Sequence, residues 1–394
     1  MSEHHSAAAM GASAALPEPM EDAKMASRTL ANVIGAEIDA TGGWISFARY
    51  MELALHHPGL GYYGGGSRKF GDSGDFVTAP ELTPLFGQTL AVQVAQITSL
   101  SSSTILEVGA GSGRLAADLL RTLDQAGQPA RRYLILELSG ELRARQQATL
   151  AESAPEYLER VEWLDRLPER FIGCVVVNEV LDAMPVHALA WRPQGLMERG
   201  VERSGDGFRW SERPASPLLE KLAAELPVAG AMESEIGLAA RSWVAEWGQR
   251  LELGALLLID YGLPRHEYYY AGRNRGTLRC HYRHRSHEDP FWWPGLCDIT
   301  THVDFTAVAE AGHAAGLDVL GYTTQANFLI NCGLGQRLAE RREEDGASAL
   351  RAAGAAQVLV SANEMGELFK AIALGRGIRE PLLGFVRGDR THTL

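Results

Sequence analysis

A glycine-rich turn near position 110 has the residue types and spacing needed to hold a ligand. It has the sequence EVGAGSG, with an acid at Glu107 and glycines at Gly109, Gly111 and Gly113. Glycine lets the backbone turn sharply and approach a ligand closely. A helix expected from Arg114 offers free backbone N–H groups at its start. By itself, the turn indicates an adenosine-type ligand bound at the edge of an α/β sheet.

The glycine spacing distinguishes between two kinds of nucleotide-binding turn. A dinucleotide turn needs the spacing GxGxxG, and counting from Gly109 its last glycine would fall on Arg114. The dinucleotide fingerprint is therefore absent. The spacing found here, with an acid two residues before the first glycine, resembles the first motif of class I methyltransferases. In those enzymes the acid helps to hold the ammonium group of S-adenosylmethionine.

Two further acids end apolar runs farther along the chain. Glu137 follows the run 133–136, where a carboxylate can accept both ribose hydroxyls. The alternative is a solvated residue at a helix start, but in this strand–helix–strand setting we favour the ribose role. Asp165 follows 161–164, where such folds meet the adenine edge, or it only caps a turn. The expected cofactor contacts are Glu107, Gly109, Ala110, Gly111, Gly113, Glu137, Leu138 and Asp165.

A second polar group follows the apolar run 175–177. It contains Asn178, Glu179 and Asp182, and ligands of open α/β sheets bind outside the carboxyl ends of the strands. Carboxylates can orient an amine, or pair bidentately with a planar guanidinium. Alternatively, Asp182 caps a helix near Ala183 and Asn178 satisfies the turn.

The elements that must position these residues alternate between strand and helix. Short apolar runs at 104–108, 133–136, 173–177 and 255–259 are typical of strands buried on both faces of a parallel sheet. The leucines between 115 and 123 lie on one face of a helix. We therefore predict a doubly wound α/β fold.

Two segments interrupt this alternation. Residues 187–211 alternate around a Gly-Asp-Gly turn and predict an inserted β-hairpin, whereas 262–304 show little periodicity. A loop as long as 262–304 is usually functional or forms a lid. We divide the chain into a disordered extension (1–26), a helical cap with a glycine-rich loop (27–100) and the main domain (101–388), with insertions near 187–250 and 262–304.

Composition limits the classes of partner and location. The net charge of −12 argues against a surface that coats nucleic acid. The 4 cysteines form no CxxC pair, so no metal site is expected and a reducing cytoplasm fits best. We expect neither a signal peptide nor a membrane span. Helices expected at 218–253 and 333–352 can pack on the domain or on a second copy of the chain, which leaves a homodimer open.

Several segments together resemble the mitochondrial complex I assembly-factor methyltransferases and their bacterial MidA-type relatives. The resemblance covers about 27–388, and its most specific segments are GDFVTAPEL at 74–82 and DITTHVDF at 298–305. The other matching segments are HPGLGYY at 57–63, LFG at 85–87, EVGAGSG at 107–113, NEVLDAMP at 178–185, DYG at 260–262 and GTLR at 276–279.

This resemblance implies a class I methyltransferase (Rossmann-like) fold with a seven-stranded sheet, S-adenosylmethionine as cofactor, and formation of symmetric dimethylarginine on a protein. It implies that Thr78, Pro80 and Glu81 close over the cofactor and that Asn178, Glu179 and Asp182 face the acceptor. It also implies that His302, as a further catalytic residue, and Asp304 line the same cleft. His302 can instead only cap or pack.

Departures from the family pattern leave alternatives for the acceptor. Val180 and Leu181 stand where the family commonly has an aromatic pair, and Cys297 stands where a polar residue is expected. A methyltransferase for a small molecule is therefore one alternative. A non-catalytic assembly or binding factor that retains a cofactor site is the other.

Overall fold

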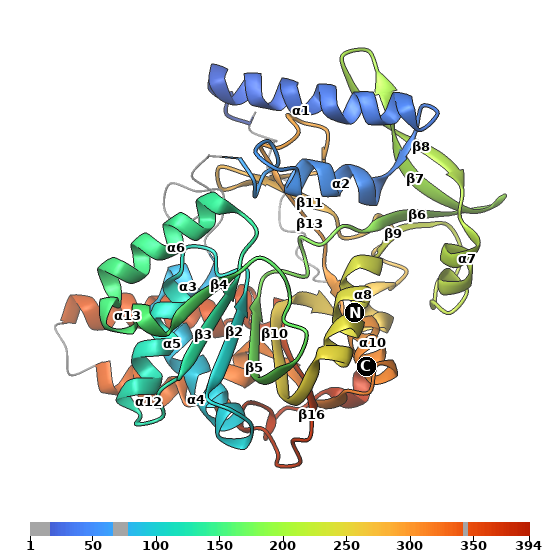
Figure 1. Cartoon of the computed structure of the whole chain (residues 1–394). Helices are drawn as coiled ribbons and strands as arrows, with labels where there is room; N and C mark the ends of the chain where they lie inside the picture. Colours follow the sequence, from blue (N-terminus) through green and yellow to red (C-terminus); the bar gives the residue numbers. More distant parts are fainter. Residues whose placement is uncertain (1–15, 66–77, 342–345) are drawn as a thin grey trace, which may run out of the picture.

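The computed structural model describes residues 16–65, 78–341 and 346–394 (Figure 1). Among these residues, the largest sheet has eight strands. Seven follow one hydrogen-bonded path: β15 (Asp318–Thr324), β16 (Phe369–Arg376), β10 (Leu251–Leu263), β5 (Phe171–Asn178), β2 (Thr104–Val108), β3 (Arg132–Leu136) and β4 (Val161–Leu164). The eighth, β14 (Val303–Asp304), pairs beside β10. The expected fold class is confirmed, but the sheet has eight strands instead of the expected seven, because β14 is added.

The order of the strands locates the ligand crevice. β2, β3, β4, β5 and β10 run parallel, and β16 is antiparallel to β10. The chain leaves β2 toward β3 and β4, and then returns to β5 on the other side of β2. Such a reversal opens a crevice at the carboxyl ends of the two central strands, so the residues after β2 and β5 lie where a ligand binds.

Helices cover both faces of this sheet, as Figure 1 shows. The strands alternate accordingly, because Ile105 packs into one core and Leu106 into the other. One face carries α4 (Pro84–Leu100), α5 (Arg114–Gln125), α6 (Gly140–Ser153), α11 (Gln325–Asn331), α12 (Leu334–Glu340) and α13 (Gly346–Val360). The other carries α8 (Leu238–Arg250) and α10 (Phe305–Ala314). The segments that left a homodimer open, 218–253 and 333–352, thus pack on their own chain through α8, α12 and α13.

A second sheet lies beside the N-terminal helices at the top of Figure 1. It joins β1 (Ile45–Ser46), β6 (His187–Arg192), β7 (Gly195–Ser204), β8 (Gly207–Pro214) and β9 (Met232–Ile236), and packs on α1 (Glu21–Ala40) and α2 (Phe47–His56). The predicted hairpin at 187–211 is therefore only part of a larger sheet, because β1 and β9 pair with it from distant positions. α1 also begins at Glu21, inside the extension expected to be disordered.

The segment expected as a loop, 262–304, contains its own small sheet. The sheet is formed by β11 (Arg279–Tyr282), β12 (Arg285–His287) and β13 (Asp298–Thr300), and it follows a short helix, α9 (Arg265–Tyr268). Cys280, Tyr282 and Ile299 pack into one core with α1 and α2. Strands of three or four residues are too short for periodicity to reveal. Further short elements are α3 (Ala79–Leu82), α7 (Pro217–Ala223), α14 (Met365–Leu368) and 3-10 turns at Pro155–Arg160, Leu383–Phe385 and Thr391–Thr393.

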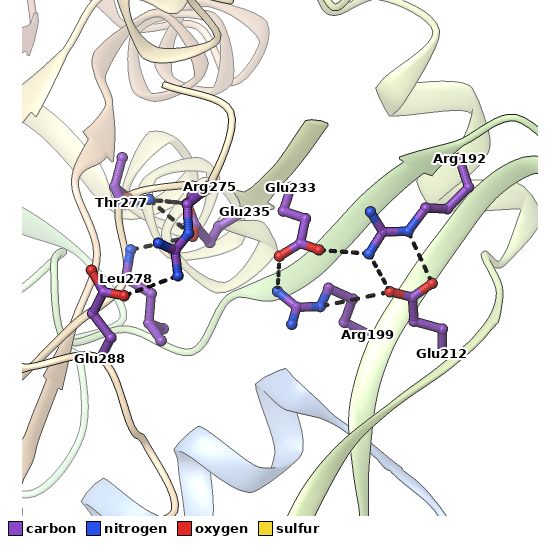
Figure 2. Close-up of polar contacts among 9 residues, drawn as sticks. All are labelled: Arg192, Arg199, Glu212, Glu233, Glu235, Arg275, Thr277, Leu278 and Glu288. Atoms are coloured by element: carbon purple, nitrogen blue, oxygen red, sulfur yellow. Dashed lines mark hydrogen bonds and ion pairs between the residues drawn. The ribbon is translucent and has the colours of Figure 1, made fainter. Parts of the chain in front are cut away.

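Figure 2 shows how polar contacts attach the small sheet to the second sheet. The buried carboxylate of Glu235, on β9, accepts hydrogen bonds from the backbone of Thr277 at 3.1 Å and of Leu278 at 3.3 Å. Gly276 has a φ of +74°, and a Cβ there would collide with that carboxylate. Beside it, Arg192 and Arg199 pair with Glu212 and Glu233 across β6 to β9. Glu235 thereby fixes the start of the segment that carries β11 and β13.

Candidate active site

A cavity of about 740 Å³ lies at the carboxyl ends of β2, β3 and β5. Its volume is in the range of pockets that bind cofactors and other small ligands. Most of the residues selected from the sequence line it: Thr78, Pro80, Glu81, Glu107, Gly109, Ala110, Gly111, Glu137, Leu138, Asn178, Glu179 and Asp182. The structure therefore brings together the glycine turn, the acid after β3 and the acids after β5.

The glycines of the turn serve different purposes. Gly109 and Gly111 have φ of +65° and +52°, which favours glycine at both positions. A Cβ at Gly109 would press on Val180 at 3.1 Å, whereas one at Gly111 would meet nothing within 4 Å. Gly111 thus leaves its backbone open to the cavity. Gly113 does not line the cavity itself, because it packs against Gln146 as the N-cap of α5, and its contact with a cofactor stays a prediction.

Glu107 is a buried carboxylate at the floor of the turn. It is 3% exposed, and its Oε2 accepts a hydrogen bond of 2.6 Å from the Tyr133 hydroxyl. Burial raises the pKa of Glu107 to about 7, and the Tyr133 bond acts in the opposite direction. A cation placed beside this carboxylate would favour its charged form.

Glu137 is held at the end of β3 by two neighbours. Its Oε1 accepts from the backbone N–H of Ser139 at 2.9 Å, and its Oε2 accepts from the Gln146 side chain at 2.9 Å. Burial raises the pKa of this carboxylate too. The side chain is therefore fixed, and a carboxylate retains lone pairs for hydroxyl donors.

The two ends of this half of the cavity fit S-adenosylmethionine. Glu107 offers a carboxylate for an ammonium group, and Glu137 offers one for ribose hydroxyls. Between them, the backbone at Gly111 faces open space where any side chain would intrude. Leu136, Leu138 and Leu142 add an apolar wall.

Residues of the predicted closing segment contact the glycine turn. The Glu81 carboxylate accepts from the Ser112 hydroxyl and lies 3.2 Å from Nε of Arg114. Thr78 and Pro80 begin α3 and line the cavity. The preceding part of that segment, 71–77, falls outside the described residues.

The backbone at Glu179 is strained in a way that aims its side chain. Glu179 has a φ of +55°, a conformation that costs a non-glycine residue about 1–3 kcal/mol. Asp260, after the central part of β10, stabilises the turn: its Oδ2 accepts from the N–H groups of Val180, Leu181 and Asp182 at 3.2, 2.9 and 3.3 Å. Strain supported in this way is typical of functional sites.

Glu179 and Asp182 form an acidic pair at the end of the cavity beyond the turn. Asn178 donates to Oε1 of Glu179 at 3.0 Å. The Tyr261 hydroxyl donates to Oδ2 of Asp182 at 2.6 Å. Oδ1 of Asp182, on a side chain only 6% exposed, and Oδ1 of Asn178 are buried and have no hydrogen-bond partner among the described residues. Burial, with the charge of Asp182, raises the pKa of Glu179 to about 8.

These features indicate that the acidic end receives a cationic donor. No lysine, arginine or histidine in the described part of the chain forms an ion pair with Glu179 or Asp182. Buried polar groups normally have partners, and buried carboxylates normally have cations beside them. A ligand with several N–H donors and a positive charge would satisfy both needs.

Three other residues selected from the sequence do not line this cavity. Asp165 is exposed and does not line the cavity. His302 lies with its ring against Tyr261 and lines a separate cavity of about 30 Å³. Burial lowers the pKa of His302 to about 4. Asp304 caps α10 through the N–H of Ala307 at 3.1 Å and pairs with Arg265.

Other residues reach the cavity that sequence reasoning had not selected. Asp298 and Thr300 line it from β13, Tyr63 lines it from the N-terminal part, and Tyr261 lines it from β10. Tyr261 follows the predicted strand 255–259 closely, so the strand-end rule that selected Glu179 could have found it. Tyr63 and Asp298 gave no such signal, because their contact joins distant parts of the chain.

The described residues contain neither a membrane-spanning helix nor a metal-binding cluster. None of their helices combines the length and the apolar character required to cross a membrane. Their His, Cys, Asp and Glu side chains form no cluster suited to a metal ion. None of the four cysteines, all of which lie among the described residues, forms a disulfide, and all four are buried.

Comparisons with known proteins agree with this geometry. The family model described as "Putative S-adenosyl-L-methionine-dependent methyltransferase" matches residues 85–323. Protein arginine methyltransferase NDUFAF7 of Mus musculus is 29% identical, over 86% of this chain and 82% of the mouse protein. Its Drosophila melanogaster homolog is 30% identical, over 94% of this chain and 91% of the fly protein.

A solved structure extends the similarity to a ligand. A Burkholderia thailandensis protein crystallised with S-adenosyl-homocysteine is 51% identical, with a TM-score of 0.94 over 96% of this chain and 100% of that one. S-adenosyl-homocysteine is S-adenosylmethionine without its transferable methyl group, and the cavity described above has the carboxylates that such a ligand needs. This chain therefore belongs to that family of S-adenosylmethionine-dependent methyltransferases and uses S-adenosylmethionine as its cofactor.

Proposed function

We propose that this methyltransferase acts on arginine residues of proteins, with Glu179 and Asp182 holding the guanidinium group. The observation that carries the proposal is the buried acidic pair with unpartnered acceptors at Asp182 and Asn178. A guanidinium has five N–H donors and a delocalised positive charge, and it pairs bidentately with carboxylates. It matches both the charge and the hydrogen-bonding capacity of this end of the cavity.

The roles of the residues follow from this arrangement. When bound, the cofactor supplies an electrophilic methyl group. Glu107 would hold the ammonium group of the cofactor, and Glu137 would hold its ribose. The backbone of the turn from Gly109 to Gly111 would lie against the cofactor between these two groups. Glu179 and Asp182 would align the acceptor nitrogen and take up the proton that it releases. Glu81 would keep α3 against the turn and so help to exclude water.

The names of the relatives support the same acceptor class. The mouse and fly relatives are protein arginine methyltransferases by name. The resemblance seen in the sequence further implies symmetric dimethylarginine as the product and a link to assembly of a respiratory complex. We include both in the proposal, with the cytoplasm as the location, which is supported by four cysteines that form no disulfide.

Methyl transfer to proteins from a deletion strain tests the proposal. Purified protein and methyl-labelled cofactor are added to the lysate, and acid hydrolysates are separated by a method that resolves the dimethylarginines. Label is expected in symmetric dimethylarginine. Label only in other amino acids or in small molecules would overturn the arginine assignment.

Two variants make the test specific to the acidic end. Glu179→Gln is expected to abolish labelling while S-adenosyl-homocysteine binding, measured by calorimetry, is unchanged. Glu225→Gln, at an exposed position outside the cavity, is the matched control and should label like the wild type. If Glu179→Gln instead corrected every cellular defect of the deletion strain, the non-catalytic alternative would be favoured.

A further inference from the structure

We propose that Asp298, oriented by Tyr63, is the third carboxylate of the acceptor site and determines its preference for a charged guanidinium over a neutral group of the same shape. This inference rests on the proposed function, because it concerns the same acceptor. Asp298 is a residue of the small sheet rather than of the main one, so its contribution depends on how that sheet is attached.

The backbone of β13 places Asp298 next to the acidic pair. The N–H of Thr301 donates to the carbonyl oxygen of Asp182 at 3.0 Å. Side chains alternate along a strand: Asp298 and Thr300 line the cavity, while Ile299 between them is 1% exposed and packs into the core. The register of β13 against β11 therefore decides that an acid faces the cavity.

Tyr63 fixes the orientation of the Asp298 carboxylate. Its hydroxyl donates to Oδ1 of Asp298 at 2.9 Å. The Tyr63 ring stacks on His56, with centroids 5.5 Å apart and an interplanar angle of 15°, and Nε2 of His56 lies 3.3 Å from the carbonyl oxygen of Ala183. Tyr63 is thus held between the acidic turn and β13, and it links the N-terminal part of the chain to the acceptor end.

The charges of the three acids act on a common region. Burial raises the pKa of Glu179, and the charges of Asp182 and Asp298 raise it further. Burial also raises the pKa of Tyr63, again with a contribution from both aspartates. Carboxylates on β13 and on the turn after β5 can approach one planar cation from different directions. An arginine side chain, with donors spread around a rigid fork, can use such an arrangement better than a compact ammonium can.

The discriminating ligand is citrulline, which has the shape of arginine but no charge. The wild type, saturated with S-adenosyl-homocysteine, is titrated with two fluorescent nonapeptide pools that are degenerate except at the centre. One pool has arginine at the centre and the other has citrulline. Fluorescence polarisation gives the preference for arginine as a ratio of dissociation constants.

Asp298→Asn should lower this preference by roughly 10- to 100-fold, since it removes one charge-assisted contact. Affinity for the citrulline pool and for S-adenosyl-homocysteine should not change. In steady-state kinetics with the arginine pool, KM should rise more than kcat falls. Glu288→Gln, an exposed acid on the same segment outside the cavity, is the matched control and should keep the wild-type preference.

Tyr63→Phe tests the orienting role of Tyr63 separately. It also provides an independent result if Asp298→Asn does not fold. It should lower the preference by a smaller factor, and the double variant should be no worse than Asp298→Asn alone, because Tyr63 acts through Asp298. An unchanged preference in Asp298→Asn, or additive losses in the double variant, would overturn this inference and leave the proposed function standing. A wild type with no preference for arginine would overturn both.

Discussion

The Tyr261 hydroxyl donates a hydrogen bond of 2.6 Å to Oδ2 of Asp182, and the other oxygen of that carboxylate is buried without a partner. One oxygen is thus used to orient the side chain, and the other is left for a ligand. The same division recurs at Asn178, whose amide nitrogen binds Glu179 while its oxygen has no partner. The acceptor end of the cavity is therefore held in a fixed geometry before any substrate binds.

Tyr261→Phe should reduce kcat/KM for the arginine-centred peptide pool by about tenfold, because the loss of one hydrogen bond to a charged group costs about 1.5 kcal/mol or more. The affinity for S-adenosyl-homocysteine, measured by calorimetry, should stay within twofold of the wild type. A variant with wild-type kcat/KM would show that Asp182 needs no orientation by Tyr261.

Glu107→Gln should weaken binding of S-adenosylmethionine by roughly 10- to 100-fold, because the ammonium group would lose its carboxylate. Tyr133→Phe, which removes only the hydroxyl that orients Glu107, should have a smaller effect. Isothermal calorimetry measures both. Glu141→Gln, at an exposed position outside the cavity, provides the control, and equal affinities for it and for Glu107→Gln would contradict the assignment.

The acidic end predicts a pH dependence of stability in the ligand-free protein. Burial raises the pKa of Glu179 from 4.5 to about 8, so the folded state keeps a proton that the unfolded state has released. This contribution to the free energy of unfolding is fully present below about pH 4.5 and is lost as pH rises to about 8. The melting temperature should therefore fall less steeply over this range in Glu179→Gln than in the wild type.

A cationic acceptor should reverse the direction of this effect. It favours the ionised form of Glu179, so binding releases a proton, and affinity for the arginine pool should increase as pH rises toward 8.

Identical pH slopes of the melting temperature in the wild type and Glu179→Gln would contradict the raised pKa of Glu179. Some dependence of the melting temperature on pH should remain in both proteins, because burial also raises the pKa of Glu107 to about 7 and the pKa of Asp118 to about 6.

Asp260→Ala should destabilise the fold by about 3 kcal/mol or more, because it leaves three N–H donors of the acidic turn without their acceptor. Asp260→Asn keeps one accepting oxygen and should cost less. Urea unfolding measures both, with Asp206→Ala, in the exposed turn between β7 and β8, as control. A loss of less than 1 kcal/mol in the free energy of unfolding of Asp260→Ala would show that the acidic turn does not need Asp260 for its stability.

The sequence predicts the part of the fold in which local pattern and long-range packing agree. The strands β2, β3, β5 and β10 were found because their apolar runs are buried on both faces of the sheet. β2, β3 and β5 end within one residue of their predicted positions, whereas β10 continues past the predicted run 255–259 to Leu263. The short strands β11, β12 and β13 have too few residues to establish a period. Strand β1 is only two residues long, and its pairing with β7 joins Ile45 to Val201, which no local pattern reveals.

The residues of the site also divide into those that a local sequence pattern predicts and those that only long-range contacts place. Glu107, Glu137 and Glu179 could be selected because each stands at the end of a predicted strand. His302 and Asp304 were selected from the resemblance, but neither lines the cavity, because His302 lies against Tyr261 and Asp304 caps α10. Asp298 faces the cavity instead, through strand alternation in β13. The bond from Tyr63 to Asp298 spans 235 residues and could not be predicted without the fold.

The most direct test of the central claim is transfer of a labelled methyl group to the arginine-centred peptide pool by the purified protein, followed by hydrolysis and amino-acid analysis. We expect label in methylated arginine with the wild type and with Glu225→Gln, and none with Glu179→Gln that still binds S-adenosyl-homocysteine. Equal labelling by the wild type and Glu179→Gln, or no labelled arginine with any of the three, would contradict it.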